Sequence, residues 1–149
     1  KHFEQIAMAK VSASALEAKE MGYLKNEDVI IANPHELLYV AKQQALAMLE
    51  SGFRSPLDDT FKVVGKAGYA NIMAQVANLF EGNFMSEHDK YCISSLAKVM
   101  TGSLVEENTV VNSKMLLDLE QKYFVELLGT QKTQDRIEFM LRNSKPLRN

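Results

Sequence analysis

Apolar residues recur three and four positions apart along most of the chain, which is the spacing of one face of an α-helix. The stretches with this spacing are residues 3–10, 14–21, 33–51, 67–81, 86–101, 112–128 and 130–143. Glycines follow many of them: Gly22, Gly52, Gly82, Gly102 and Gly129. Glycine tolerates the left-handed conformation in which many helices end. The pattern predicts an all-α fold, an antiparallel bundle of about five to seven helices with at most one or two very short strands.

Several predicted helices begin with a capping signal. Ser14 and Glu17 match a capping box, in which the serine oxygen accepts from the amide three residues on and the glutamate reaches back. The short, alanine-rich helix that follows ends at Gly22 and suits close packing against a neighbour. Asn33 is a good N-cap, and Pro34 suits the first helical position because that N–H has no helical partner.

The same spacing predicts which side chains form the core. In the helix that begins at Asn33, the apolar face consists of Leu38, Ala41, Ala45, Met48 and Leu49. In the helix opened by the segment Ser86–Asp89, it consists of Tyr91, Ile93, Leu96, Ala97 and Met100. In the helix opened by Ser113 or Asn112, it consists of Leu116, Leu119, Tyr123 and Leu127, and in the last helix of Ile137, Met140 and Leu141.

Two stretches depart from the helical pattern. Residues 28–32 carry consecutive branched apolar side chains and predict a short strand. Residues 53–65 contain Pro56, Asp58 and Asp59, which predict a loop with a brief extended piece at 61–64. This loop is the only candidate hinge, and no repeat of constant period is visible, so residues 1–149 are predicted to form a single helical domain.

Composition and charge indicate a soluble globular chain. Hydrophobic residues make up 46% of the 149 positions, charged residues 24%, and the net charge is -2. This balance gives no reason to expect a nucleic acid or an anionic membrane as partner. The single cysteine, Cys92, excludes an internal disulfide and fits a reducing cytoplasm. No apolar run approaches the ~20 residues of a membrane span.

His88 and Cys92 are the first candidates for chemistry, because they lie four positions apart on one predicted helix. That spacing can supply two ligands of a zinc site, but zinc needs three or four, and His2 and His35 are distant in sequence. Cys92 as a nucleophile needs His88 as base and an activating environment. The core pattern that follows Cys92 favours a small buried side chain instead, so we predict neither a metal site nor a catalytic residue.

Paired carboxylates are the second candidates, since two acids can share acid–base work. The pairs are Glu87/Asp89, Asp58/Asp59, Glu106/Glu107 and Asp118/Glu120. All fall at helix starts, in loops or on polar faces, where carboxylates are common. The sequence also lacks a GxGxxG, a P-loop or a GxSxG motif. We therefore expect no cofactor in this chain and no self-contained active site.

The opening stretch FEQIAMAKVSASALEAKEMGYL resembles the segment after the catalytic core in the crotonase (enoyl-CoA hydratase/isomerase) family. The matching positions are Ser14, Ala15, Glu17, Ala18, Gly22 and residues 29–31. Later stretches, among them LLDLEQKYFVELLGTQKTQDRIEFMLRN and the ending SKPLRN, resemble the C-terminal part of a large bacterial 3-hydroxyacyl-CoA dehydrogenase.

The resemblance implies that the chain is a noncatalytic C-terminal fragment of an NAD-dependent enzyme of fatty-acid β-oxidation. Residues 1–52 would end its crotonase-like part, and residues 66–149 would form a helical extension. The partners implied are acyl-CoA through the parent enzyme, the remainder of the parent chain, and other copies of the enzyme as subunit contacts. The role would be structural, with a cover over the acyl-CoA site as one form of it. A stand-alone helical module that binds a partner protein is the alternative.

The resemblance also implies one ligand contact near the C-terminal end. In hydratases of the crotonase family, an aromatic and a basic residue one turn apart can contact the adenine and phosphate of CoA. The matching pair here is Phe139 and Arg142, with Lys145 nearby, and the spacing suits a stacking face beside a cation. The alternative is that Phe139 is ordinary packing and Arg142 a charge at a helix end.

Overall fold

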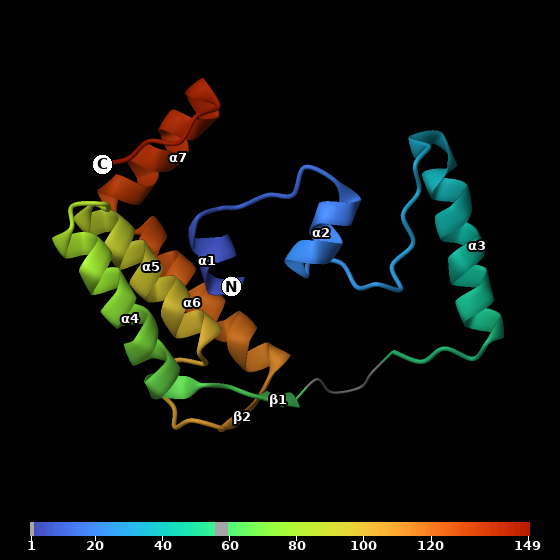
Figure 1. Ribbon diagram of the computed structural model, residues 1–149, viewed down its shortest axis with the longest axis horizontal. Coiled ribbons are helices and arrows are strands. Elements are labelled where there is room, and N and C mark those ends of the chain that lie inside the picture. Colours follow the sequence, from blue (N-terminus) through green and yellow to red (C-terminus); the bar gives the residue numbers. More distant parts are fainter. Residues whose placement is uncertain (1, 56–59) are drawn as a thin grey trace. The chain divides into compact units, whose positions relative to one another are not determined.

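The computed structural model describes residues 2–55 and 60–149. Within them the chain forms seven α-helices, one 3-10 turn and one two-stranded antiparallel sheet, which confirms the all-α prediction (Figure 1). The chain divides into two compact units, Lys1–Leu57 and Asp58–Asn149. Their assignment to a crotonase-like part and a C-terminal extension stays a prediction. In the described part of the chain, no helix combines the length and the apolar character needed to cross a membrane.

The first unit begins with two short helices, α1 (His2–Ala7) and α2 (Ala15–Met21). The buried Gln5 side chain donates from Nε2 to the Met21 carbonyl over 3.3 Å and so connects the two helices. Ser14 Oγ accepts from the Glu17 amide as predicted, but the Glu17 carboxylate accepts from the Ala13 amide and not from Ser14. The predicted stop at Gly22 is confirmed, with a left-handed φ of 86°.

The predicted strand at residues 28–32 is not formed. The only strand pairing in the described residues joins β1 (Thr60–Lys62) to β2 (Val110–Asn112). Val29 and Ile30 are exposed. The prediction failed because branched apolar residues favour a strand only where a neighbouring strand can pair with them.

The next helix begins where the sequence predicts, but its predicted apolar face is not buried. Asn33 Oδ1 accepts from the His35 amide over 3.1 Å, and Pro34 opens a 3-10 turn, η1 (Pro34–Glu36), that leads into α3 (Leu37–Glu50). No residue of α3 is buried. The predicted core face, Leu38, Ala41, Ala45, Met48 and Leu49, is exposed, because α3 packs mainly against the turn that precedes it.

The second unit contains a layer of three helices that lie side by side (Figure 1). The middle helix is α5 (Glu87–Met100), and α4 (Gly65–Glu81) and α6 (Ser113–Leu128) flank it. A short turn joins α4 to α5, and a longer segment that contains β2 joins α5 to α6. These three helices run antiparallel in sequence order (Figure 1), and α7 follows α6 after a single turn. The elements in chain order are β1, α4, α5, β2, α6 and α7 (Gln131–Asn143).

The middle of this unit is built on small residues of α5 and on Thr101, which caps its C-terminal end. Ala97 is fully buried, and Ser95 and Thr101 are nearly so. The Thr101 hydroxyl donates to the Ala97 carbonyl over 2.8 Å, so this buried polar group is satisfied within its own helix. Ser94 Oγ lies 2.9 Å from the Tyr69 hydroxyl of α4 and links the two helices.

Most of the other predicted core positions of this unit are partly buried. Four of them, Tyr91, Ile137, Met140 and Leu141, are exposed, contrary to the prediction. Helix α7 contacts α6 and, through Thr133 and Arg136, the start of α5. These contacts leave Ile137, Met140 and Leu141 exposed.

The helix starts of the second unit confirm the capping signals. Ser86 Oγ accepts from the Asp89 amide and Asp89 Oδ2 from the Ser86 amide, which is a complete capping box. Asn112, of the two candidates, caps α6 by accepting from the Met115 amide over 2.9 Å. The sheet partner β2 was not predicted, whereas the extended piece at 61–64 overlaps β1.

Candidate functional site

A polar junction between the start of α5 and α7 contains the buried histidine. His88 is 5% exposed, and its Nε2 lies 2.9 Å from Thr133 Oγ1 of α7. Thr133 Oγ1 in turn lies 2.8 Å from Thr130 Oγ1, the residue that precedes α7. The ring is therefore held between two helices by a hydroxyl pair, and we name His88, Asp89, Thr133, Arg136 and Asn149 the α5–α7 junction.

Arg136 is the centre of this junction. Its Nη1 donates to Asp89 Oδ1 over 2.8 Å, its Nε donates to Asn149 Oδ1 over 2.8 Å, and its Nη2 donates to the Asn149 carbonyl over 3.2 Å. The Arg136 and Asp89 side chains are 21% and 24% exposed, so solvent screens this ion pair only in part. One guanidinium thus fastens the start of α5 and residue 149 to α7.

The electrostatics of the junction favour a neutral histidine. Burial lowers the pKa of His88 below 6.5, and the positive charges of Arg136 and Lys132 lower it further, against an opposing effect of Asp89. Burial alone would raise the pKa of Asp89, but hydrogen bonds from the Ser86 amide and from Arg136 outweigh it, so the pKa is lowered. Burial raises the pKa of the Cys92 thiol, with Arg136 acting in the opposite direction.

Cys92 and His88 were the first candidates for chemistry, and the structure gives the surroundings of both. A nucleophilic cysteine needs a lowered pKa, and that of Cys92 is raised. Nε2 of His88 faces Thr133, so the ring is already engaged. Among residues 2–55 and 60–149, no three His, Cys, Asp or Glu side chains are placed to hold a metal ion.

The candidate carboxylates are dispersed over the surface. Asp89 pairs with Arg136, Glu106 with Lys66, and Asp118 with Lys114 over 3.1 Å. Asp58 and Asp59 lie outside the described residues. In each of these three ion pairs the partner of the carboxylate is a lysine or an arginine.

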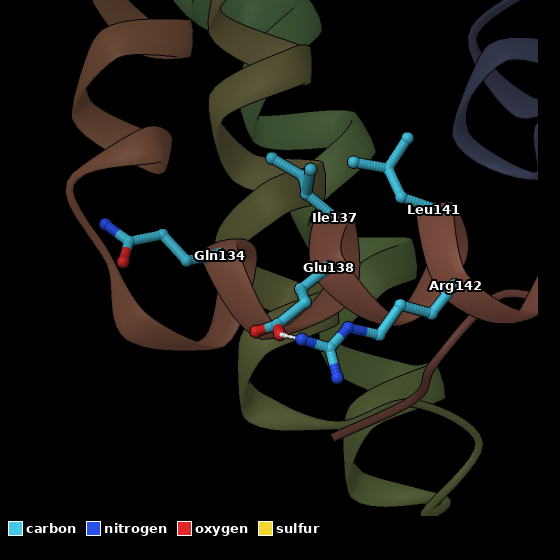
Figure 2. Close-up of a pocket in the computed structure, with 5 residues that line it drawn as sticks. All are labelled: Gln134, Ile137, Glu138, Leu141 and Arg142. Atoms are coloured by element: carbon cyan, nitrogen blue, oxygen red, sulfur yellow. Dashed lines mark ion pairs between the residues drawn. The ribbon is translucent and has the colours of Figure 1, made fainter.

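A shallow groove follows one side of α7. Gln134, Ile137, Glu138, Leu141 and Arg142 line it, and all five belong to this one helix. In Figure 2, Ile137 and Leu141 point to the same side, while Glu138 and Arg142 meet beside them in an ion pair of 2.6 Å. Because only one helix lines this groove, its other side is open to a second element or molecule.

The predicted CoA contacts lie near this groove but do not converge. Arg142 lines the groove, exposed and paired with Glu138. Phe139 is half-buried, and Lys145 is exposed beyond the end of α7. The structure thus brings one of the three residues to the groove, and the CoA contact stays a prediction.

Sequence reasoning missed the residues that hold the junction. Thr130, Thr133 and Arg136 follow one another at intervals of three, which places polar groups along one side of α7. This signal was available, but nothing local pairs Arg136 with Asp89, which is 47 positions away.

Comparison with known proteins gives one whole-chain similarity. The chain is 44% identical over its 149 residues to a protein of Bacillus subtilis (strain 168) described as a probable 3-hydroxyacyl-CoA dehydrogenase. The similarity extends along the whole chain. It covers 19% of that protein, in its C-terminal part. No family model matches the chain, and no solved structure matches it.

Proposed function

We propose that this chain is the C-terminal helical part of an NAD-dependent 3-hydroxyacyl-CoA dehydrogenase of fatty-acid β-oxidation. The observation that carries the proposal is the 44% identity over all 149 residues. The parent reaction converts a 3-hydroxyacyl-CoA and NAD⁺ into a 3-oxoacyl-CoA, NADH and a proton. The enzyme would work in the cytoplasm, in keeping with the single cysteine of this 149-residue chain.

The described residues do not fit NAD. Dinucleotide sites of this class place a glycine-rich turn between a parallel strand and a helix. Here the only sheet in the described residues is the antiparallel pair of three-residue strands, and the sequence has no GxGxxG motif. We derive no catalytic step from this chain and place hydride transfer in the remainder of the parent enzyme.

The role proposed for this part is structural. The α5–α7 junction ties helices together, since His88 lies against Thr133 and Asp89 pairs with Arg136. Large apolar side chains remain exposed on α6 and α7, among them Leu117, Phe124 and Leu141. Surfaces of this kind suit packing against the rest of the enzyme, in subunit contacts or over the acyl-CoA site.

The CoA contact of Phe139, Arg142 and Lys145 belongs to this proposal. Arg142 would need to leave Glu138 to meet a phosphate, since its guanidinium is already paired. The exchange is feasible because the pair is exposed and weak. An Arg142→Ala variant of the parent enzyme is expected to raise KM for acyl-CoA with little change in kcat.

A stand-alone helical interaction module is the second candidate. The exposed apolar surface of α3 supports it, because an apolar helix face can bind a partner helix or an apolar groove. Under the first candidate the gene encodes a complete dehydrogenase that oxidises 3-hydroxyacyl-CoA. Under the second it encodes a binding protein without this activity.

The test is a dehydrogenase assay with 3-hydroxybutyryl-CoA and NAD⁺, followed by NADH absorbance. It compares the 149-residue chain with the complete product of the gene that encodes it. Activity in the complete product and none in the 149-residue chain is expected. Activity in neither would contradict the proposal and favour the interaction module.

A further inference from the structure

Helix α3 exposes large apolar side chains on three sides. A helix turns by about 100° per residue, so residues seven or eleven positions apart lie nearly in line. Three such rows follow the helix: Leu37 with Met48, Leu38 with Leu49, and Tyr39 with Leu46. Leu38 is 82% exposed and Leu49 75%, and the other two rows are also exposed.

The rows extend over about 200° of the helix circumference, by the same geometry. A helix that packs on one flat surface needs an apolar stripe of roughly 100°. A helix that is apolar around most of its circumference is typical of a buried helix. The sequence of α3 therefore fits a groove that contacts it on more than one side.

Within its own unit, α3 has no such groove. Its main neighbour is η1, the turn that leads into it, and none of its residues is buried. An isolated helix of fourteen residues is marginally stable in water even with favourable residues. The described residues of its own unit therefore do not supply the contacts that would hold α3.

We infer that α3 docks in an apolar groove formed by the preceding residues of the parent enzyme, with the edge marked by Gln43 toward water. The inference rests on the proposed function. The Bacillus relative is about five times as long as the stretch that this chain matches, since the match covers 19% of it. It therefore has ample chain to form a groove.

A second copy of this chain is a weaker candidate for the same place. A two-fold dimer brings the same face of α3 from each copy together. That contact covers one or two neighbouring rows and leaves the third in water. A groove in a larger body covers all three.

The polar residues of α3 agree with this orientation. Gln43 lies outside the arc of the three apolar rows, whereas Glu50, eleven positions after Tyr39, lies nearly in line with the row of Tyr39 at the last residue of the helix. Lys42 lies between two apolar rows, and its long apolar stem allows the ammonium to reach the rim of a groove. The helix thus has a narrow polar edge and a wide apolar arc.

The test is amide hydrogen exchange of α3 in the complete product of the gene and in the 149-residue chain. We expect exchange in α3 to be at least ~100-fold slower in the complete product. Leu38→Lys and Leu46→Lys, which lie on different rows, should each abolish that protection. Gln43→Lys, on the polar edge, is the matched control and should retain it. Protection of α5 in each variant shows that the second unit is folded.

Three results would overturn the inference. They are fast exchange of α3 in the unmodified complete product, an effect of only one of the two leucine substitutions, and protection of α3 in the 149-residue chain itself, as a dimer or a monomer. The dehydrogenase assay on the same preparation keeps the two proposals separate. A protected α3 without dehydrogenase activity would contradict the proposed function and leave the docking intact.

Discussion

Helices α3 and α5 each have fourteen residues, and their burial is the reverse of what their compositions suggest. Ten residues of α3 are hydrophobic, against seven in α5. Yet α3 has no buried residue, and α5 contributes His88, Ser95 and Ala97 to the interior. Composition therefore does not decide which helix is central.

The difference comes from neighbours and from satisfied polar groups. Helix α5 lies between α4 and α6, and its polar side chains find partners: His88 on Thr133, Ser94 on Tyr69 and Asp89 on Arg136. A buried polar group is tolerated when it is hydrogen-bonded. Helix α3 contacts mainly the turn η1 within its unit, so that unit leaves its apolar side chains uncovered.

The largest expected effect compares one substitution in the two helices. Ala97→Asp places an unpaired carboxylate where the alanine is fully buried, and should lower the free energy of unfolding by more than ~3 kcal/mol. Ala45→Asp, on exposed α3, should cost less than ~1 kcal/mol, mostly through helix propensity. Urea denaturation of the 149-residue chain, followed by circular dichroism, measures both. Equal costs would show that α5 is not the core helix.

The next effect separates a partly buried ion pair from an exposed one. Arg136→Ala removes the partner of Asp89 and the donors to Asn149, and should lower the free energy of unfolding by about 1–3 kcal/mol. Arg142→Ala breaks the exposed pair with Glu138 and should cost no more than ~0.5 kcal/mol. A loss for Arg136→Ala as small as that for Arg142→Ala would contradict the assignment of the α5–α7 junction as the anchor of α7.

The junction also predicts a pH dependence of stability. The pKa of His88 is lowered in the folded chain, so folding favours the neutral ring. Its contribution is complete above the unfolded pKa of 6.5 and is lost as the pH falls through the folded pKa, with a slope of at most ~1.4 kcal/mol per pH unit.

Urea denaturation between pH 7.5 and pH 4.5 measures this slope. His88→Gln should flatten it, whereas His35→Gln, at an exposed position of η1, should leave it unchanged. Asp89, whose pKa is also lowered, loses its contribution only below its unfolded pKa of 3.8, outside this range. An unchanged slope in His88→Gln would rule out His88 as its source.

The smallest expected effect concerns the start of α5. Ser86→Ala removes the acceptor for the Asp89 amide and should cost about 1 kcal/mol. Ser113→Ala changes the first residue of α6 but not its cap, which is Asn112, and should be nearly neutral. Thermal unfolding of the two variants distinguishes them. A larger loss of stability for Ser113→Ala than for Ser86→Ala would show that Asn112 is not the residue that caps α6.

The sequence predicted those parts of the fold that depend on local signals. The caps at Ser14, Asn33 and Ser86 and the stop at Gly22 lie where expected, because each is a short-range hydrogen bond or backbone conformation. The strand at 28–32 was wrong, since pairing depends on a distant neighbour. The prediction that α3 has a buried apolar face was wrong for the same reason, since burial also depends on a distant neighbour.

The candidate site was less predictable than the helices. His88 and Cys92 were found as residues that could carry chemistry, and the structure places them in or beside a structural junction. Arg136 was missed because its partners, Asp89 and Asn149, lie 47 and 13 positions away. Periodicity predicts which residues share one face of a helix, but it does not predict which distant residue contacts that face.

The contrast between α3 and α5 is tested most directly by amide hydrogen exchange on the 149-residue chain in dilute solution. We expect amides in the middle of α5 to be strongly protected and those of α3 to exchange at nearly the rate of an unstructured peptide. Equal protection of the two helices in a monomer would contradict this account, because α3 would then have its partner within the chain.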